Sequence, residues 1–74
     1  MPTETIASVT VNGEPRDLPA GLALPDVLRR FDLDPEQPGL AVARNGAVVR
    51  RALWSETRVE HGDELEVITA TQGG

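Results

Sequence analysis

Few residues of this 74-residue chain could carry out chemistry by themselves. The sequence has one histidine, His61, two serines and no cysteine, whereas a nucleophilic triad needs a base next to its nucleophile. The acidic residues are spread one or two at a time, which leaves no identifiable carboxylate pair for hydrolysis and no calcium-loop spacing. His61 lies in a His-Gly-Asp sequence without partner ligands, which favours a solvated turn residue over a catalytic or metal-binding one. The sequence therefore does not indicate an autonomous enzyme.

The C-terminal end is the remaining segment with usable chemistry. It consists of Thr-Ala-Thr-Gln-Gly-Gly, with no charged side chain, and it ends at the carboxylate of Gly74. Gly73 and Gly74 lack Cβ atoms, so this carboxylate can enter a narrow channel in another protein and adopt backbone angles closed to other residues. A frayed chain end would have the same composition. The rest of the sequence must decide between these two interpretations.

The composition limits the class of protein. With 39% apolar and 26% charged residues, the chain fits one compact globular domain. No apolar run approaches the roughly 20 residues of a bilayer span, and the N-terminus lacks the layout of a secretory signal. We therefore expect a single domain over residues 1–74, located in the cytoplasm.

The charged residues and the missing residue types limit the partners. A net charge of −5 repels nucleic-acid phosphates and anionic lipids, so we expect neither nucleic acid nor a membrane as a partner. Without cysteine, any sulfur chemistry must use sulfur brought by another molecule. Without lysine, the chain cannot accept side-chain isopeptide links, although a composition bias explains this absence as readily as selection does.

The first third of the sequence predicts a β-hairpin. Apolar and polar residues alternate over residues 6–11, as in a half-buried strand whose odd-numbered residues face the core. Asn12-Gly13 follows directly, and this dipeptide favours a two-residue turn at positive φ, which returns the chain through residues 14–18. Pro15 cannot donate a ladder hydrogen bond, so we expect the second strand at an edge of the sheet.

One helix is expected after the break at residues 19–21. Its apolar stripe has the spacing i, i+3, i+4 and i+7 and consists of Leu24, Val27, Leu28 and Phe31. Pro25 suits the first helical turn, and Asp26 complements the positive end of the helix dipole. Ala23, at the expected N-cap position, is a poor cap because it has no side-chain acceptor.

The second half of the sequence predicts three more strands. We expect a strand at residues 40–44, a turn at Asn45-Gly46, a short strand at residues 48–49 and a last strand at residues 64–69. Residues 50–59 lack periodicity and should wrap around the core with Leu53 or Trp54 inserted.

This order of elements predicts an α+β fold of the β-grasp (ubiquitin-like) type, a mixed sheet of four to five strands with one packed helix. The last strand should lie beside the first and parallel to it. Residues 70–74 would then form a flexible C-terminal arm.

Several landmarks along the chain resemble a known family. They are Val11-Asn12-Gly13, Gly21 before Val27-Leu28, Val42-Ala43 before Asn45-Gly46, Val48-Val49 with Arg51 and Trp54, Gly62-Asp63, and Gly73-Gly74. In this order they resemble the ThiS-type sulfur carriers over nearly the full chain, and more weakly MoaD and ubiquitin. Arg51 and Trp54 favour the ThiS type over the other β-grasp carriers.

The resemblance implies a carrier protein that is acted on by partner enzymes and binds no cofactor or metal itself. An E1-like (ThiF-like) adenylating enzyme would use ATP and magnesium to adenylate Gly74, while Gly73 and Gln72 enter its active site. A sulfur donor protein would then convert the acyl-adenylate to a thiocarboxylate. Activation is needed because a free carboxylate is a stable anion that sulfur does not attack. A ThiG-like thiazole synthase would receive the sulfur and build the thiazole of thiamine.

Partner docking in this fold would use the exposed face of the sheet beside the C-terminus. Ile68 is the apolar residue that the last strand directs outward there, and Ala43 could extend the patch. Scattered exposed apolar residues are also normal on protein surfaces. Arg50 and Arg51 could face an acidic partner surface or simply be solvated.

Other functions remain open from the sequence. A carrier of the same mechanism could serve molybdopterin synthesis, cysteine synthesis or tRNA thiolation. From a different class, the chain could be a β-grasp interaction module or a protein modifier joined to target lysines through its Gly-Gly.

Overall fold

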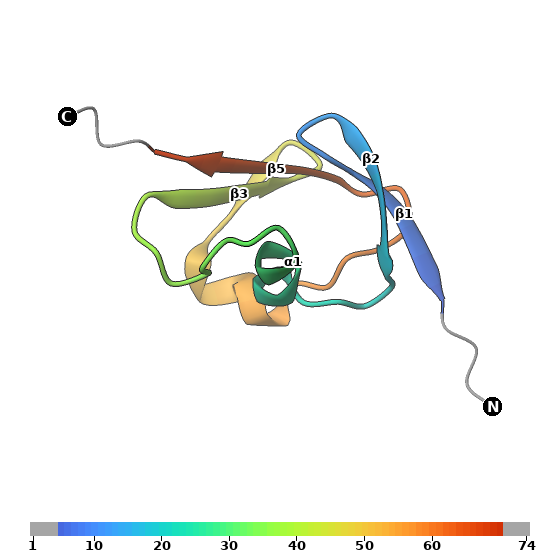
Figure 1. Cartoon of the computed structure of the whole chain (residues 1–74), viewed down its shortest axis with the longest axis horizontal. Helices are drawn as coiled ribbons and strands as arrows, with labels where there is room; N and C mark the ends of the chain where they lie inside the picture. The colour runs from blue at the N-terminus through green and yellow to red at the C-terminus, as the bar shows by residue number, and fades with distance from the viewer. Residues whose placement is uncertain (1–4, 71–74) are drawn as a thin grey trace.

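The computed structural model describes residues 5–70, and it has the predicted β-grasp architecture (Figure 1). Its elements, in chain order, are β1 (Ile6–Val11), β2 (Glu14–Pro19), α1 (Leu24–Arg30), β3 (Leu40–Arg44), β4 (Ala47–Val49), the 3₁₀ helix η1 (Arg51–Glu56) and β5 (Glu64–Thr69). The strands form one mixed sheet, and the two helices cover one of its faces. Within residues 5–70, no helix is long and apolar enough to cross a membrane.

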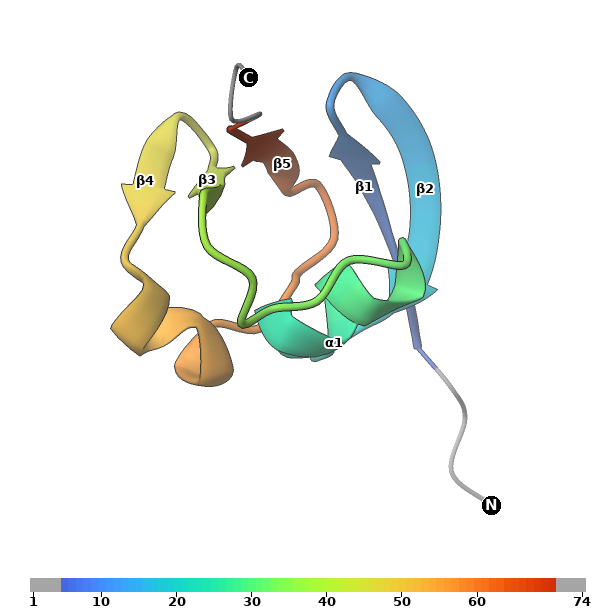
Figure 2. The same cartoon turned by 60° about the vertical axis from the view of Figure 1, so that its left-hand side comes forward.

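The sheet has the order β2-β1-β5-β3-β4, so the last strand of the chain lies in the middle. β5 is parallel to β1, as predicted, and antiparallel to β3. β2 lies at an edge, as the proline at position 15 predicted. Figure 2 shows the β1–β2 and β3–β4 hairpins on the two sides of β5.

Both hairpins turn at an Asn-Gly dipeptide, as predicted. Asn12 has a φ of 53° and Gly13 of 84°, and the corresponding values for Asn45 and Gly46 are 52° and 85°. These angles suit a two-residue turn whose twist matches that of the flanking strands.

α1 begins without a side-chain cap, and the amide of Leu24 is satisfied by another segment instead. Ala23 makes no capping hydrogen bond, but the N–H of Leu24 donates to the carbonyl of Thr57 at 3.0 Å. Ala23 and Arg58 also form a short β-bridge. The chain after η1 thus compensates for the poor cap that the sequence predicted.

The core lies between the inner face of the sheet and the helices. Its buried apolar residues are Ala7, Val9, Val11, Leu18, Leu24, Val27, Leu28, Leu40, Val42, Trp54, Val59 and Leu65. Phe31, the last residue of the predicted helical stripe, is only half-buried and follows α1. Of the two candidates for insertion after β4, Trp54 is buried and its indole N–H donates to the carbonyl of Val49 at 2.8 Å, whereas Leu53 is exposed.

Arg51 has a structural role that the sequence did not predict. Its guanidinium lies 4.5 Å from the centroid of the Trp54 ring and donates hydrogen bonds to the carbonyls of Pro35, Gln37 and Leu40. These contacts fasten the loop before β3 to η1. Arg51 is therefore not simply solvated, because part of its guanidinium is engaged within the fold. Arg50 beside it is exposed.

Candidate functional site

The predicted working residues Gln72, Gly73 and Gly74 lie outside the described residues, so the site is defined by the strand that leads to them. β5 ends at Thr69, and Ala70 continues its ladder with β3 by donating its N–H to the carbonyl of Gly39 at 2.8 Å. Ala70, which we predicted to begin the arm, is thus held to the chain segment before β3. Gly39 has a φ of 80°, and a Cβ there would lie 3.2 Å from the Ala70 carbonyl oxygen, so this close approach favours glycine.

The side chain of Asn12 holds β5 on the side of β1. Its Oδ1 accepts a hydrogen bond from the N–H of Val67 at 2.8 Å, and its Nδ2 donates to the carbonyl of Val67 at 3.2 Å. The backbone N–H of Asn12 donates to the carbonyl of Leu65 at 2.9 Å. Asn12 therefore serves both as the turn residue with positive φ and as a link to β5, and only the first role followed from the sequence.

Asn45 makes the equivalent contact on the side of β3. Its backbone N–H donates to the carbonyl of Glu64 at 2.7 Å, and its Oδ1 accepts from the N–H of Glu64 at 2.8 Å. The two Asn-Gly turns thus bind the backbone of β5 from opposite sides. The signal in the sequence was the repeated dipeptide, but the contact with a strand 19 or more positions away was not predictable from local patterns.

A buried carboxylate, Asp63, fixes the start of β5. Asp63 is 5% exposed and accepts hydrogen bonds from the Arg44 guanidinium at 3.0 Å, from the Asn45 amide at 3.2 Å and from the backbone N–H of Glu60 at 2.8 Å. Burial by itself would raise the pKa of Asp63, but the backbone hydrogen bond, the amide and the guanidinium outweigh it and lower that pKa. Asp63 is thus held as a carboxylate that joins the start of β5 to the β3–β4 hairpin.

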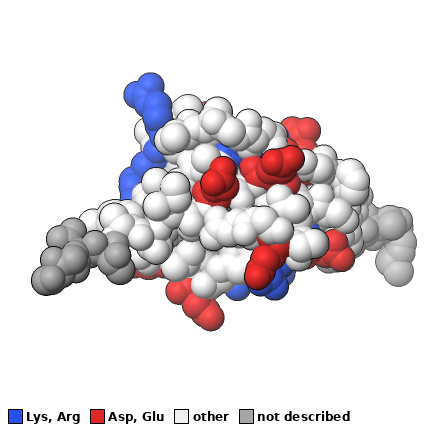
Figure 3. All heavy atoms as spheres, turned by 90° about the horizontal axis from the view of Figure 1, so that it is seen from above, with Lys and Arg blue, Asp and Glu red and all other residues white. Residues whose placement is uncertain are grey.

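The outward face of the sheet carries an apolar patch next to the end of β5. Ile68, predicted to face outward, is 56% exposed and lies directly opposite Ala41, whereas Val48 is 75% exposed and lies opposite Ala43. We call these four residues the outer patch. Ala43, the second predicted docking residue, is half-buried within it. Figure 3 shows this face from above, where uncharged surface is interrupted by separate acidic side chains.

Val48 was missing from the predicted docking residues because a three-residue strand is too short to show an alternating pattern. Its outward direction follows only from its register with Ala43 across the hairpin. The predicted outward direction of Ile68 is confirmed, since Leu65 is buried, Val67 is half-buried and Ile68 is exposed.

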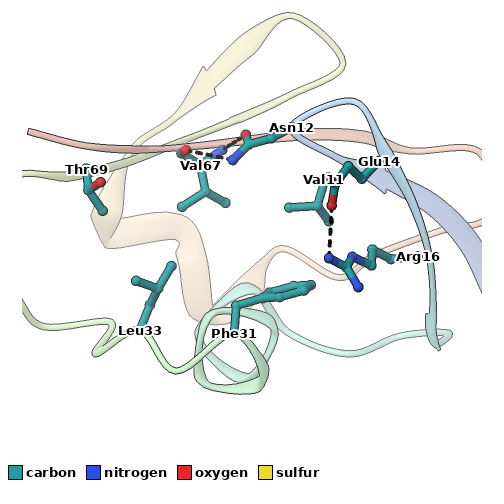
Figure 4. Close-up of a pocket in the computed structure, with 8 residues that line it drawn as sticks. All are labelled: Val11, Asn12, Glu14, Arg16, Phe31, Leu33, Val67 and Thr69. Carbon is teal, nitrogen blue, oxygen red and sulfur yellow. Dashed lines mark hydrogen bonds and ion pairs between the residues drawn. The ribbon is translucent and has the colours of Figure 1, made fainter.

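A pocket of about 340 Å³ opens on the inner side of β5, where β1 ends. We call it the hairpin pocket, and its lining residues are Val11, Asn12, Glu14, Arg16, Phe31, Leu33, Val67 and Thr69. Figure 4 shows Phe31 and Leu33 below Val67, with the Glu14–Arg16 ion pair at one side. Arg16 also lies 5.5 Å from the centroid of the Phe31 ring. This pocket was not predictable from the sequence, because its lining residues come from segments that are distant along the chain.

His61 lies in an exposed turn, as predicted, and its Nδ1 accepts a hydrogen bond from the backbone N–H of Ser8 at 3.2 Å. Across residues 5–70, no group of three His, Cys, Asp or Glu side chains is placed to hold a metal ion. In the described part of the chain, the features available for binding are therefore the end of β5, the outer patch and the hairpin pocket beside it.

Comparison with known proteins agrees with this arrangement. A model of the ThiS family matches residues 9–74 of the chain. The crystal structure of a thiamine biosynthesis protein (ThiS) from Geobacter metallireducens is similar, with a TM-score of 0.75 and 28% sequence identity over 90% of this chain and 99% of that chain. An NMR solution structure of a thiamine biosynthesis protein from the same organism has a TM-score of 0.73 and 29% identity over 90% and 87% of the two chains. These matches confirm the predicted resemblance.

A curated relative is much longer than this chain. A thiazole synthase from Magnetococcus marinus is 35% identical over 66 residues, which are 89% of this chain but 20% of that protein. The chain thus spans about a fifth of the length of this relative. A segment similar to this chain is therefore part of a thiazole synthase polypeptide.

Asp63→Asn should destabilise the fold in a pH-dependent way. The folded pKa of Asp63 lies below its usual value of 3.8, so the carboxylate contributes stability above that pH and loses it as the pH falls through the folded pKa. At neutral pH we expect the free energy of unfolding to fall by about 2 kcal/mol, because buried partners lose an ionised acceptor. Urea unfolding of both proteins at a series of pH values measures this.

The gap in stability between the wild type and Asp63→Asn should shrink once the pH is below 3.8. Glu66→Gln is the matched control, since Glu66 is an exposed carboxylate on β5, the strand that begins directly after Asp63. A gap that stays constant with pH, or a control that behaves like Asp63→Asn, would contradict the assigned role.

Proposed function

Since the chain belongs to the ThiS family, we propose that it is a sulfur carrier of thiamine biosynthesis whose working group is the Gly74 carboxylate. The observation that carries this proposal is the extent of the family match, which runs from residue 9 through residue 74 and so includes Gly73-Gly74. The fold supports it as well, because the middle strand β5 leads directly to this terminus.

The chemistry of the carrier is simple, and partners supply most of it. A carboxylate oxygen of Gly74 attacks the α-phosphorus of ATP in an adenylating enzyme, and pyrophosphate leaves. A hydrosulfide ion delivered by a donor protein then attacks the acyl carbon, so that a C–S bond forms, the bond to the phosphate breaks and AMP leaves. The product is a thiocarboxylate on Gly74. ATP and magnesium belong to the adenylating enzyme, and the carrier contributes only its terminus and its docking surface.

The receiving enzyme in this proposal is a thiazole synthase. The similarity to a segment of the Magnetococcus marinus thiazole synthase supports this choice, because that polypeptide combines a segment like this chain with the synthase. The family match favours thiamine over the molybdopterin, cysteine and tRNA pathways, and over a protein modifier or interaction module. We place these steps in the cytoplasm.

The outer patch is the docking surface in this proposal. Ile68 lies two residues before Ala70 and contributes an exposed isoleucine side chain, and Val48 extends the same apolar face by another exposed side chain. An enzyme that draws in the terminus must pack against the surface where the chain leaves the sheet. Large apolar side chains in the middle of such a contact contribute most to its affinity.

Ile68→Asp should weaken binding to the adenylating enzyme by about tenfold or more, because a charge would be buried in an apolar contact. Leu53→Asp is the matched control, since Leu53 is a comparably exposed leucine on η1, and binding should change little. Isothermal titration calorimetry measures both affinities. Equal affinities for the two variants would exclude the outer patch as the docking surface.

Deletion of Gly73-Gly74 should abolish activation and leave the fold intact. ATP–pyrophosphate exchange catalysed by the adenylating enzyme should disappear, since the acceptor carboxylate is displaced. The melting temperature should stay nearly unchanged, because the buried core residues of the described chain all lie between Ala7 and Leu65.

The matched control for this deletion is a chain shortened by two residues at its N-terminus, which should support exchange at the wild-type rate. Exchange that persists without Gly73-Gly74 would refute the proposed acceptor. A fall of many degrees in the melting temperature of the deletion variant would instead refute the view that the terminus is separate from the core.

A further inference from the structure

β5 has an open backbone edge immediately before the C-terminus. On one side, β5 pairs with β3 along residues 65–69. On the other side, it pairs with β1 only at Thr10↔Glu64 and Val11↔Leu65, because β1 ends there and turns away at Asn12. The side of β5 that faces β1 is therefore not covered by a strand beyond Leu65.

The hydrogen bonds on either side show which backbone groups face this edge. Ala70 donates to Gly39, and Asn45 donates to Glu64, so the even-numbered residues of β5 direct their N–H and C=O groups toward β3. The odd-numbered residues direct theirs toward β1, since these groups alternate along a strand. The carbonyl of Leu65 is bound by the backbone of Asn12, and both groups of Val67 are bound by the Asn12 side chain.

Thr69 is the next odd-numbered residue, and its N–H and C=O point to the same open side. Within residues 5–70, the structure shows no hydrogen bond to either group on that side. Both side-chain hydrogen bonds that Asn12 makes to β5 go to Val67. An exposed pair of backbone donor and acceptor on a strand is a template for pairing with another strand.

The hairpin pocket lies under this open edge. Thr69 and Val67 direct their side chains to the inner face, where they line the pocket together with Leu33 and Phe31 (Figure 4). A residue that pairs directly with Thr69 on an added strand would direct its side chain to the same face. Such a residue would enter the pocket beside Phe31, Leu33 and Val67, whose apolar surface fits an aliphatic or aromatic side chain. The Glu14–Arg16 ion pair forms a charged side of the same pocket.

Gly74 is only a few residues from this edge, so a partner that binds Gly74 must also come near the edge. Gly74 is four residues beyond Ala70, and four extended residues span at most about 14 Å. An enzyme that reacts with the Gly74 carboxylate must therefore approach closely to Thr69 and Ala70. Its backbone can then satisfy the N–H and C=O of Thr69.

We propose that an extended segment of the thiazole synthase adds to the open edge of β5 as a sixth strand, pairs with the backbone of Thr69 and places an apolar side chain in the hairpin pocket. This inference rests on the proposed function and extends it to how the carrier is recognised. Strand addition gives affinity through main-chain hydrogen bonds, and the pocket gives specificity through one side chain.

The test removes the N–H of Thr69 and keeps the hydrogen bonds between β5 and β3. Thr69→Pro eliminates that donor at a position whose N–H points away from β3, where proline is tolerated in a strand. Thr69→Ala is the matched control, since it changes the side chain and keeps the N–H. We expect the affinity for the thiazole synthase to fall by about tenfold for Thr69→Pro and to change by less than about twofold for Thr69→Ala. Surface plasmon resonance with the purified synthase measures both.

A second form of the test does not depend on the tolerance of proline. A chemically assembled chain can carry an ester in place of the amide N–H of Thr69, which exchanges a single donor for an oxygen. This chain should bind the synthase as weakly as Thr69→Pro, and the amide of Thr69 in the wild type should exchange with solvent more slowly in the complex than in the free carrier.

Wild-type affinity for the ester chain, or unchanged exchange at Thr69 in the complex, would overturn the proposed strand addition. The proposed function is tested separately, because the wild-type carrier must still form a thiocarboxylate and transfer its sulfur whichever way the synthase binds. A carrier that forms no thiocarboxylate would refute the function, whereas a normal carrier with an unimportant Thr69 amide would refute only the strand addition.

Discussion

The structure depends on the position of β5, the last strand of the chain, in the middle of the sheet. A middle strand must satisfy its backbone groups on both sides, yet nothing later in the described chain can pack over it. The fold does this as far as Val67 with a full ladder to β3, a short ladder to β1, and the side chains of Asn12 and Asn45. Asp63 fastens the start of the strand in the same way. The hairpins thus hold the strand that leads to the terminus.

In this arrangement, the residues that stabilise the fold are different from those at the end of β5 that are available for binding. The core and the network around Asp63 keep β5 in place, while its far end meets an exposed apolar patch and a pocket. This division fits the proposed carrier role, in which the terminus would react while the fold behind it stays unchanged. The absence of cysteine fits the proposed chemistry, since no thiol of the chain could intercept an activated terminal carboxylate.

Local sequence patterns predicted the secondary-structure elements but not the contacts between residues that are distant along the chain. Alternating residues, the two Asn-Gly turns and the helical stripe were sufficient for the strands, the hairpins and α1, because each pattern lies within one element. The partners of Arg51, the choice of Trp54 over Leu53 and the direction of Val48 depend on packing between segments. So does the link from Asn12 to Val67, 55 residues apart. The site was predicted in part for the same reason: Ile68 follows from alternation, but the hairpin pocket exists only once the chain is folded.

The most direct test of the account is the intact mass of the protein isolated from cells that also produce its adenylating enzyme and sulfur donor. The account predicts a species heavier than the sequence mass by the difference between one sulfur and one oxygen. Fragmentation should place that difference at Gly74. A protein that carries only its unmodified carboxylate under these conditions, or that carries the added sulfur elsewhere in the chain, would contradict it.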